Sequence, residues 1–414
     1  MPSNPNVLMM TSVLRPLPTA KHYAWVCSAG SKGYCATKEM LQNGIPGHTY
    51  LIESGDFRDV GASSGDGCLL IYCFTEEVVF NYGHHIPISV SHLTVYGNVS
   101  AVPKVFLQGC TGLTSLDLGP LSQLREVQFA FLEGCAGLTT LDLSPFSRVT
   151  KIHGSFLRSC YGLTSLDLSP LSQLREVPGS FLRDCFELTS LDLGPLSRVT
   201  KVEGLFLQDC NGLTSLDLSP LSQITKARGC FLQGCSGLKT LDLSPLSRVT
   251  EVQESFLREC AGLTALDLSP LSQITEIQGF FLCGCRGLTS LDLTPLSRVV
   301  YVQESFLYGC RGLTALDLSP LSQITEVRED FLAGCSGLTS LDLSPLSRVT
   351  DVNEGFLAEC SGLSSLDLSP LSQVRQIQWG FLLRCTSINV VDRPPTHCDA
   401  PPDWSRVANQ WVRD

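Results

Sequence analysis

The nine residues GLTSLDLSP at positions 162–170 return letter for letter at 212–220 and at 337–345. Variants with few changes fill the other rows when the chain is laid out with a period of 25, and one cysteine per row falls in register without insertion or deletion. A fixed period between about 20 and 50 residues is typical of a solenoid, in which each coil stacks on its neighbours. The cysteine column consists of Cys110, Cys135, Cys160, Cys185, Cys210, Cys235, Cys260, Cys285, Cys310, Cys335, Cys360 and Cys385.

Each row contains two apolar stretches that predict extended chain. Leu166 and Leu168 enclose Asp167, which is the alternation of a short strand with its leucines facing inward. Proline then closes this face at a corner, and pairs such as Val199 and Val202 predict a second short extended edge. The fold expected is therefore a repeat solenoid with parallel β-strands on one face and a second extended edge.

The segment F-L-x2-C predicts about one helical turn, which a left-handed glycine such as Gly162 would end. A lone coil has too little apolar surface to fold, so the array must be sealed at both ends. Residues 88–392 are expected to form eleven regular coils with eroded end coils. Residues 1–87 are expected to form a small α+β cap, with strands at CLLIYCF and EEVVF and a helix at ATKEMLQNG.

Residues 393–414 are expected to form the other cap. Trp404, Val407, Trp411 and Val412 fall at helical spacing and predict a short amphipathic helix over the last coil.

The arrangement F-x3-C-x2-L-x2-L-x-L, followed by [VI]-x2-[VI], resembles the BspA-like branch of the leucine-rich repeat superfamily over residues 88–392. The resemblance implies protein recognition on a curved solenoid, with no catalysis and no cofactor. Pro120 and Leu121 stand where the common leucine-rich pattern has asparagine, so an asparagine ladder is not implied. Members of this branch are often surface proteins, which makes a surface or adhesion protein the alternative.

Composition excludes several functional classes. Apolar residues make up 43% of the chain and charged residues 17%, which predicts a folded protein. The formal net charge of −11 argues against a nucleic-acid partner. No apolar run reaches the length of a membrane span, and the N-terminal residues show no export signal. These observations favour a cytoplasmic protein, a monomer more than an oligomer, that binds another protein.

The cysteines of the column are expected to be buried, reduced thiols, because free cysteine packs as a small hydrophobe. A reducing compartment fits that interpretation. No metal site is expected, since Cys283 with Cys285, and His84, His85 and His92 with Cys68 and Cys73, lack a recognised ligand spacing. An enzyme with its chemistry in residues 1–87 is the least favoured alternative.

A column of aspartates is the most unusual polar feature. Each carboxylate is expected to accept hydrogen bonds from neighbouring backbone and hydroxyl groups at an Asx-type corner. The alternative is an acidic track that binds cations or a repetitive basic partner. These candidate partner-binding residues are Asp117, Asp142, Asp167, Asp192, Asp217, Asp242, Asp267, Asp292, Asp317, Asp342 and Asp367.

Row-to-row differences are concentrated elsewhere. The exposed positions beside the aspartates hardly change between rows, whereas the residues before the phenylalanine and around the cysteine differ, as at His153, Tyr161, Phe186, Arg286 and Arg311. A single discrete partner would be recognised there, unless the differences are neutral. A second alternation, of Gln123 and its equivalents with Arg148 and its equivalents, indicates duplication of a unit made of two rows.

Overall fold

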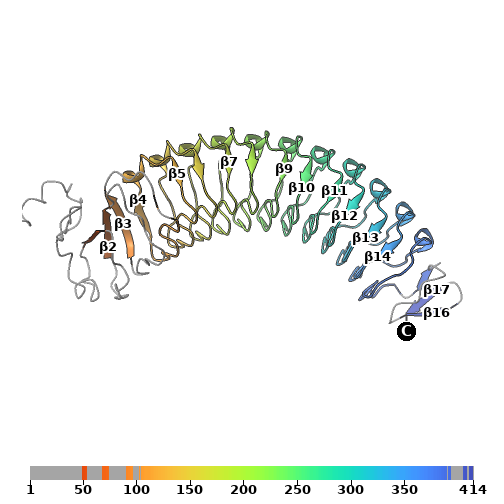
Figure 1. The fold of residues 1–414 in the computed structure, drawn as a ribbon. Helices are drawn as coiled ribbons and strands as arrows, with labels where there is room; N and C mark the ends of the chain where they lie inside the picture. Colours follow the sequence, from red (N-terminus) through yellow and green to blue (C-terminus); the bar gives the residue numbers. More distant parts are fainter. Residues whose placement is uncertain are drawn as a thin grey trace, which may run out of the picture.

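The computed structural model describes residues 49–53, 68–73, 90–96, 102, 104–388, 390–392, 404–407 and 410–413. Stacked coils, one for each row of the repeat, follow one another along a curved arc (Figure 1). The repeat solenoid predicted from the period is therefore confirmed, and it curves without an asparagine ladder. The helix expected at ATKEMLQNG and the strand expected at EEVVF lie outside the described residues.

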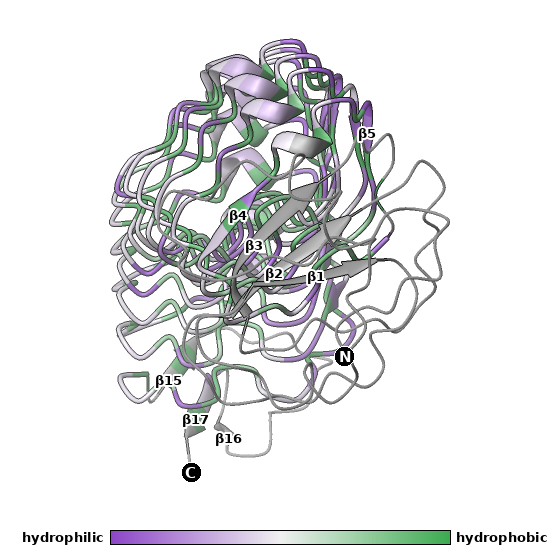
Figure 2. Cartoon of the chain, turned by 90° about the vertical axis from the view of Figure 1, so that its left-hand side faces the viewer, coloured by the Kyte–Doolittle hydropathy of each residue, from purple (hydrophilic) through white to green (hydrophobic). Residues whose placement is uncertain are grey.

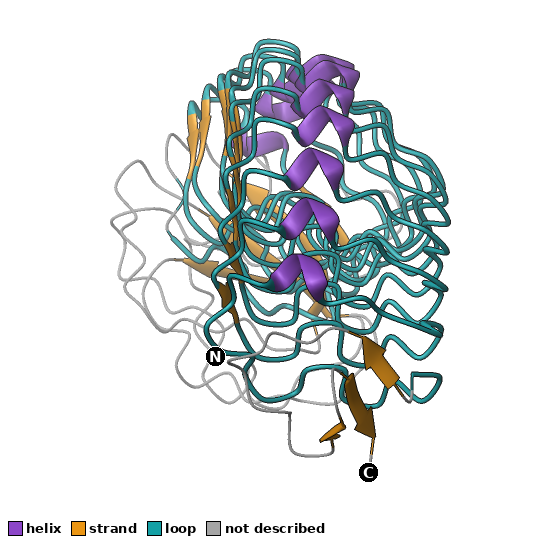
Figure 3. Cartoon of the chain, turned by 90° about the vertical axis from the view of Figure 1, so that its right-hand side faces the viewer, coloured by secondary structure: helices purple, strands orange, loops and turns teal. Residues whose placement is uncertain are grey.

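A single 3-10 turn in each coil forms the outer, convex edge of the arc (Figure 1). Proline occupies its second residue, where a fixed φ favours the turn and no backbone donor is required. Figure 2 colours this row of turns as hydrophilic, and Figure 3 shows it as one line of short helical ribbons. The turns are η2 (Gly119–Leu121), η3 (Ser144–Phe146), η4 (Ser169–Leu171), η5 (Gly194–Leu196), η6 (Ser219–Leu221), η7 (Ser244–Leu246), η8 (Ser269–Leu271), η9 (Thr294–Leu296), η10 (Ser319–Leu321), η11 (Ser344–Leu346) and η12 (Ser369–Leu371).

The second extended edge is confirmed as a set of two-residue strands that pair in parallel between neighbouring coils. The partners occupy the same position in adjacent rows of the repeat, as do Glu176 and Lys201. The hydrogen-bonded pairs are β5 (Glu126–Val127) with β6 (Lys151–Ile152), β7 (Glu176–Val177) with β8 (Lys201–Val202), β9 (Lys226–Ala227) with β10 (Glu251–Val252), β11 (Glu276–Ile277) with β12 (Tyr301–Val302), and β13 (Glu326–Val327) with β14 (Asp351–Val352).

The leucine face has the predicted alternation but few backbone hydrogen bonds. Leu166 and Leu168 are buried while Asp167 is exposed. Between coils this face makes isolated bonds, such as Thr164 N–H to the Thr139 carbonyl at 3.0 Å. Only its first coil carries a regular strand, β4 (Ser115–Asp117), so the parallel strands of the later described coils lie on the second edge.

The F-L-x2-C segment differs from the single helical turn expected from its sequence. Ser155, Leu157 and Ser159 have φ of 61°, 53° and 57°, so every second residue here has a positive φ. Their N–H groups bond alternately to the following coil and the preceding coil, as Ser155 does to Gly179 at 2.8 Å and Leu157 does to Phe131 at 3.1 Å. Bonds to both neighbours offset the strain of positive φ in non-glycine residues.

The glycine at Gly162 is not among the left-handed residues, which corrects the predicted cap. A Cβ at Gly162 would lie 2.4 Å from the carbonyl oxygen of Ala136 in the preceding coil, so glycine is required for close approach of the backbones. Glu187 and Ser387 replace glycine at this position in two of the coils.

A phenylalanine column forms the centre of the core. From Phe106 to Phe381 each ring contacts the next, with centroids 5.2–6.4 Å apart. Most pairs are stacked nearly parallel, which is a favoured arrangement of aromatic side chains. The core is thus continuous through the described coils.

Strands, not the predicted helix, seal the C-terminal end. Strands β15 (Val390–Asp392) and β16 (Trp404–Val407) both pair antiparallel with β17 (Gln410–Arg413). Trp411 is fully buried, with its ring 6.0 Å from Phe381 in an edge-to-face contact, and Trp404 is also buried. The expected aromatic residues therefore cover the last coil, but they belong to a small sheet and not to a helix.

A parallel ladder leads into the first regular coil at the N-terminal end. Strands β1 (Thr49–Glu53), β2 (Cys68–Cys73), β3 (Val90–Tyr96) and β4 pair in that order. The strand predicted at CLLIYCF is confirmed over Cys68–Cys73, and its last residue lies outside the described part of the chain. This sheet continues across residue 88, where the sequence pattern placed the start of the solenoid.

Candidate functional site

The cysteine column lies inside the coils and is structural. Each thiol from Cys135 onward donates a hydrogen bond of 3.0–3.4 Å to the carbonyl of a leucine in the preceding coil, as Cys160 does to Leu132. All twelve side chains are buried. The predicted packing of cysteine as an interior residue is therefore confirmed, and this column presents no reactive group to a ligand.

Burial also favours the protonated form of column thiols such as Cys210 and Cys260. It raises the pKa of Cys210 and of Cys260 to about 12, since a thiolate would be deprived of solvent there. Outside the column, Cys230 is half-buried and Cys283 is buried. Among the described residues, no group of three or more histidine, cysteine or acidic side chains could hold a metal ion.

The aspartate column forms the corner before each 3-10 turn. In every described coil the carboxylate accepts the N–H two residues later at 2.7–2.9 Å, as Asp167 does from Ser169. The hydroxyl of the same residue also donates, for example Ser144 to Asp142 at 2.9 Å. The Asx-type corner is thus confirmed, and it accounts for aspartate at this position without a ligand.

These corner bonds also stabilise the charge. The Ser169 hydroxyl, and then its backbone N–H, lower the pKa of Asp167, and the same groups act at Asp217, Asp267 and Asp317. These four carboxylates therefore favour the ionised form, and the whole row is exposed and held by local donors.

On the other side of the 3-10 turns, arginine and glutamine alternate and bond to each other. Arg148 Nη1 donates to Gln123 Oε1 in the preceding coil at 2.7 Å, and four further pairs repeat this contact at 2.7–3.1 Å. The two-row period of the sequence thus corresponds to a hydrogen-bonded pair of coils.

A third surface, here called the variable edge, comprises the residues not buried in the core that lie from seven positions before each column cysteine to one position after it. Five of the six exposed large hydrophobic residues among the described residues belong to it: Phe129, Tyr161, Phe186, Tyr308 and Trp379. The sixth, Val300, lies on the second extended edge. None lies on the aspartate face, so the exposed apolar groups gather where the rows differ.

The most ordered feature of the variable edge is an aromatic pair. Tyr161 and Phe186 come from adjacent coils, with centroids 5.0 Å apart and planes within 4° of each other. They remain 43% and 40% exposed, so their stacking leaves much of both rings uncovered. Phe129, which comparison of the rows did not single out, is 47% exposed on the same edge.

Charged groups of the variable edge are mostly paired. Arg286 Nη2 lies 3.8 Å from Glu259 Oε2, and Arg384 Nη1 lies 2.9 Å from Glu359 Oε1. The exposed Arg311 side chain makes no hydrogen bond or ion pair within the described part of the chain. In the next coil, Gly284 stands at the position equivalent to Glu259. Arg311 therefore lacks the glutamate that lies beside Arg286.

In the described ranges no helix is long and apolar enough to cross a bilayer. The sequence matches a family model described as "BspA type Leucine rich repeat region (6 copies)" at residues 87–214, 178–313 and 275–397, which together cover most of the chain. No curated protein sequence matches it.

One solved structure shows the same fold, and a second aligns less closely. A leucine-rich repeat protein from Bacteroides ovatus aligns at 20% identity with a TM-score of 0.51, covering 80% of this chain and 82% of its own. A leucine rich cell surface protein from Faecalibacterium prausnitzii aligns at 16% identity and a TM-score of 0.48, over 85% and 83% of the two chains.

Proposed function

This chain belongs to the family of BspA-type leucine-rich repeat proteins, and on that premise we propose that it is a non-catalytic scaffold that binds another protein along its variable edge. The observation that carries the proposal is the clustering of exposed aromatic side chains on that edge. Aromatic residues and arginine dominate the binding energy of protein interfaces, because they bury large areas at low entropic cost.

The Tyr161–Phe186 pair is the proposed anchor. Two exposed rings that already stack on each other lose little side-chain freedom when a partner covers them. Arg311, which lies in the same column as Tyr161 six coils further along, supplies the charged part of the surface. Differences between rows give this edge the specificity that the uniform aspartate face lacks.

The aspartate column remains a candidate for a repetitive cationic ligand. Its row of exposed carboxylates supports that role, although the corner bonds already account for aspartate at this position. If cations bind there, millimolar calcium or polyamine should raise the melting temperature. An unchanged melting temperature would leave the column as a structural corner only.

The test compares two double variants made in the same two coils. Tyr161→Ser with Phe186→Ser removes the aromatic pair, and Asp167→Asn with Asp192→Asn removes two charges from the aspartate face while keeping an oxygen acceptor. Wild type and each variant are cross-linked to proteins in extracts of the native source. The cross-linked proteins are then quantified by mass spectrometry and compared. Partners lost with the aromatic variant and retained with the asparagine variant support the proposal, whereas the reverse pattern would transfer binding to the aspartate face.

We place this scaffold in a reducing compartment, because buried column thiols suit an environment without oxidants. The measurement is a count of free thiols in protein alkylated during denaturation straight from its source. If nearly all nineteen cysteines react, the result supports a cytoplasmic scaffold. Extensive disulfides, or a glycan on Asn98 of the glycosylation sequon Asn98-Val99-Ser100, would favour the surface or adhesion protein.

A further inference from the structure

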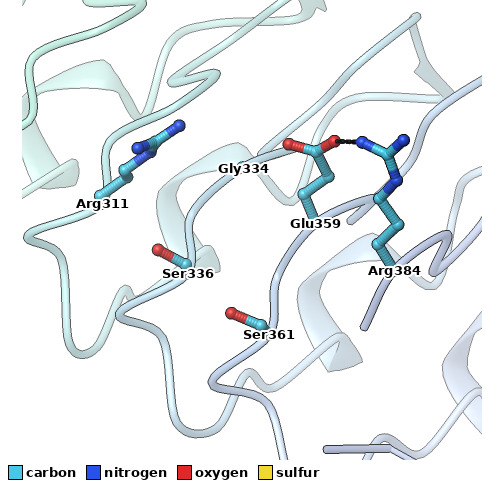
Figure 4. Close-up of a pocket in the computed structure, with 6 residues that line it drawn as sticks. All are labelled: Arg311, Gly334, Ser336, Glu359, Ser361 and Arg384. Atoms are coloured by element: carbon cyan, nitrogen blue, oxygen red, sulfur yellow. Dashed lines mark hydrogen bonds and ion pairs between the residues drawn. The ribbon is translucent and has the colours of Figure 1, made fainter. Parts of the chain in front are cut away.

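A small pocket opens on the variable edge near the C-terminal end of the solenoid. Its volume is about 290 Å³, and four successive coils contribute its lining from positions beside their column cysteines. The lining residues are Arg311, Gly334, Ser336, Glu359, Ser361 and Arg384. Figure 4 shows Arg311 on one side, the two serines in the middle, and the Glu359–Arg384 pair on the other side.

One positive charge in this pocket has no counterpart. Arg384 donates to Glu359 at 2.9 Å, so those two charges are matched. Arg311 lacks an intramolecular acceptor in the described part of the chain, since Gly284 stands where the preceding coil has Glu259. The residues that line the pocket therefore carry one excess positive charge, although the whole chain carries a net charge of −11.

The remaining lining consists of small donors. Ser336 and Ser361 occupy the same position in adjacent coils and are half-buried, and their hydroxyls make no hydrogen bond among the described residues. Gly334 is left-handed, with φ of 74°, and adds no side chain to the pocket. A guanidinium with nearby hydroxyls is the donor set that recognises carboxylate and phosphate oxygens.

We propose that this pocket binds an oxyanion, a carboxylate or a phosphate group, through the Arg311 guanidinium and the hydroxyls of Ser336 and Ser361. The proposed protein-binding role bears only on the source of the oxyanion, which would be an acidic or phosphorylated segment of the partner. Binding of free phosphate tests the pocket alone, so its result is separable from that role.

The experiment measures fluorescence anisotropy of two labelled peptides, hexaglutamate and a peptide with one phosphoserine, at low salt with the full chain. Both are competed with inorganic phosphate. Arg311→Gln should weaken binding about tenfold or more, because a charge-assisted hydrogen bond is lost. The matched control Arg286→Gln should change it less than about twofold, since Glu259 already neutralises that arginine.

The relative affinity of the two peptides identifies the preferred oxyanion. Ser336→Ala with Ser361→Ala should weaken binding as well, without a change in melting temperature. Equal binding by the Arg311→Gln variant would overturn the proposal, as would equal weakening by both arginine variants or the absence of binding to any probe.

Discussion

Replacing the buried cap residue Trp411 by alanine should destabilise the last coils of the solenoid and leave the stability of its middle coils unchanged. Trp411 is fully buried, and its ring meets Phe381 edge to face with centroids 6.0 Å apart. Removal of such a side chain costs about 3–5 kcal/mol. In a repeat array each coil is stabilised by its nearest neighbours, so the loss should be concentrated in the last coils.

The assay is amide hydrogen exchange followed by mass spectrometry. About 4 kcal/mol corresponds to roughly a thousandfold faster exchange. This faster exchange should affect amides near the cap, such as that of Leu382, which donates to the Phe356 carbonyl at 3.2 Å. The equivalent amide of Leu157, which donates to Phe131 at 3.1 Å, should keep its wild-type rate.

The control is Trp379→Ala, a tryptophan that is 63% exposed near the same end. Loss of an exposed side chain should change stability by less than about 0.5 kcal/mol. Equal acceleration near Leu157 and Leu382 in the Trp411 variant would refute the nearest-neighbour reasoning. No acceleration at either position would refute the sealing role of the C-terminal sheet.

Three further perturbations address the interior and the corners. Phe256→Ala, which removes a ring stacked 5.9 Å and 5.8 Å from its neighbours, should cost about 3–5 kcal/mol and split urea unfolding into two transitions; a single transition would contradict this expectation. Because burial raises the pKa of Cys210 and Cys260 from 9.0 to about 12, the thiols contribute stability that is complete below pH 9 and declines as pH rises above it. Denaturant unfolding at pH 8 and pH 10 should show that decline, and alkylation of native protein should modify the half-buried Cys230 before any column cysteine. Asp217→Ala should lower the melting temperature more than Asp217→Asn, which retains an oxygen for the Ser219 N–H. The lowered pKa of Asp217 means that its contribution is present above about pH 4 and disappears as pH falls through the lowered value.

The solenoid could be predicted from sequence because its determinants are local and repeated. Twelve cysteines in register and the alternation around Asp167 fix the coil length and the buried face. The left-handed residues of the F-L-x2-C turn could not be predicted in the same way. Leucine and serine disfavour positive φ, and only the hydrogen bonds to both neighbouring coils make that conformation favourable at Leu157 and Ser159.

The C-terminal cap shows the limit of short periodic patterns. The spacing of Trp404, Val407 and Trp411 fits one face of a helix, but the same tryptophans are buried from two paired strands. A pattern this short does not distinguish a helix from paired strands, because pairing with β15 depends on the fold of the preceding coil.

Comparison of the rows located the variable edge, since differences stand out against a strict repeat. The aromatic character of the edge at Tyr161 and Phe186 was visible in the sequence, whereas their mutual stacking required the structure. The unmatched charge of Arg311 follows from the register once the Glu259–Arg286 contact is known.

The absence of insertions between coils turns the solenoid into a molecular ruler. Tyr161 and Arg311 occupy the same position six coils apart, so their separation is a whole number of coil rises, about 29 Å for strands stacked about 4.8 Å apart. Gain or loss of one coil would shift a docked partner by one rise and place arginine beside arginine, or glutamine beside glutamine, on the outer edge. A change of two coils preserves that alternation, so the length of this ruler should vary most easily in steps of one arginine–glutamine pair of coils.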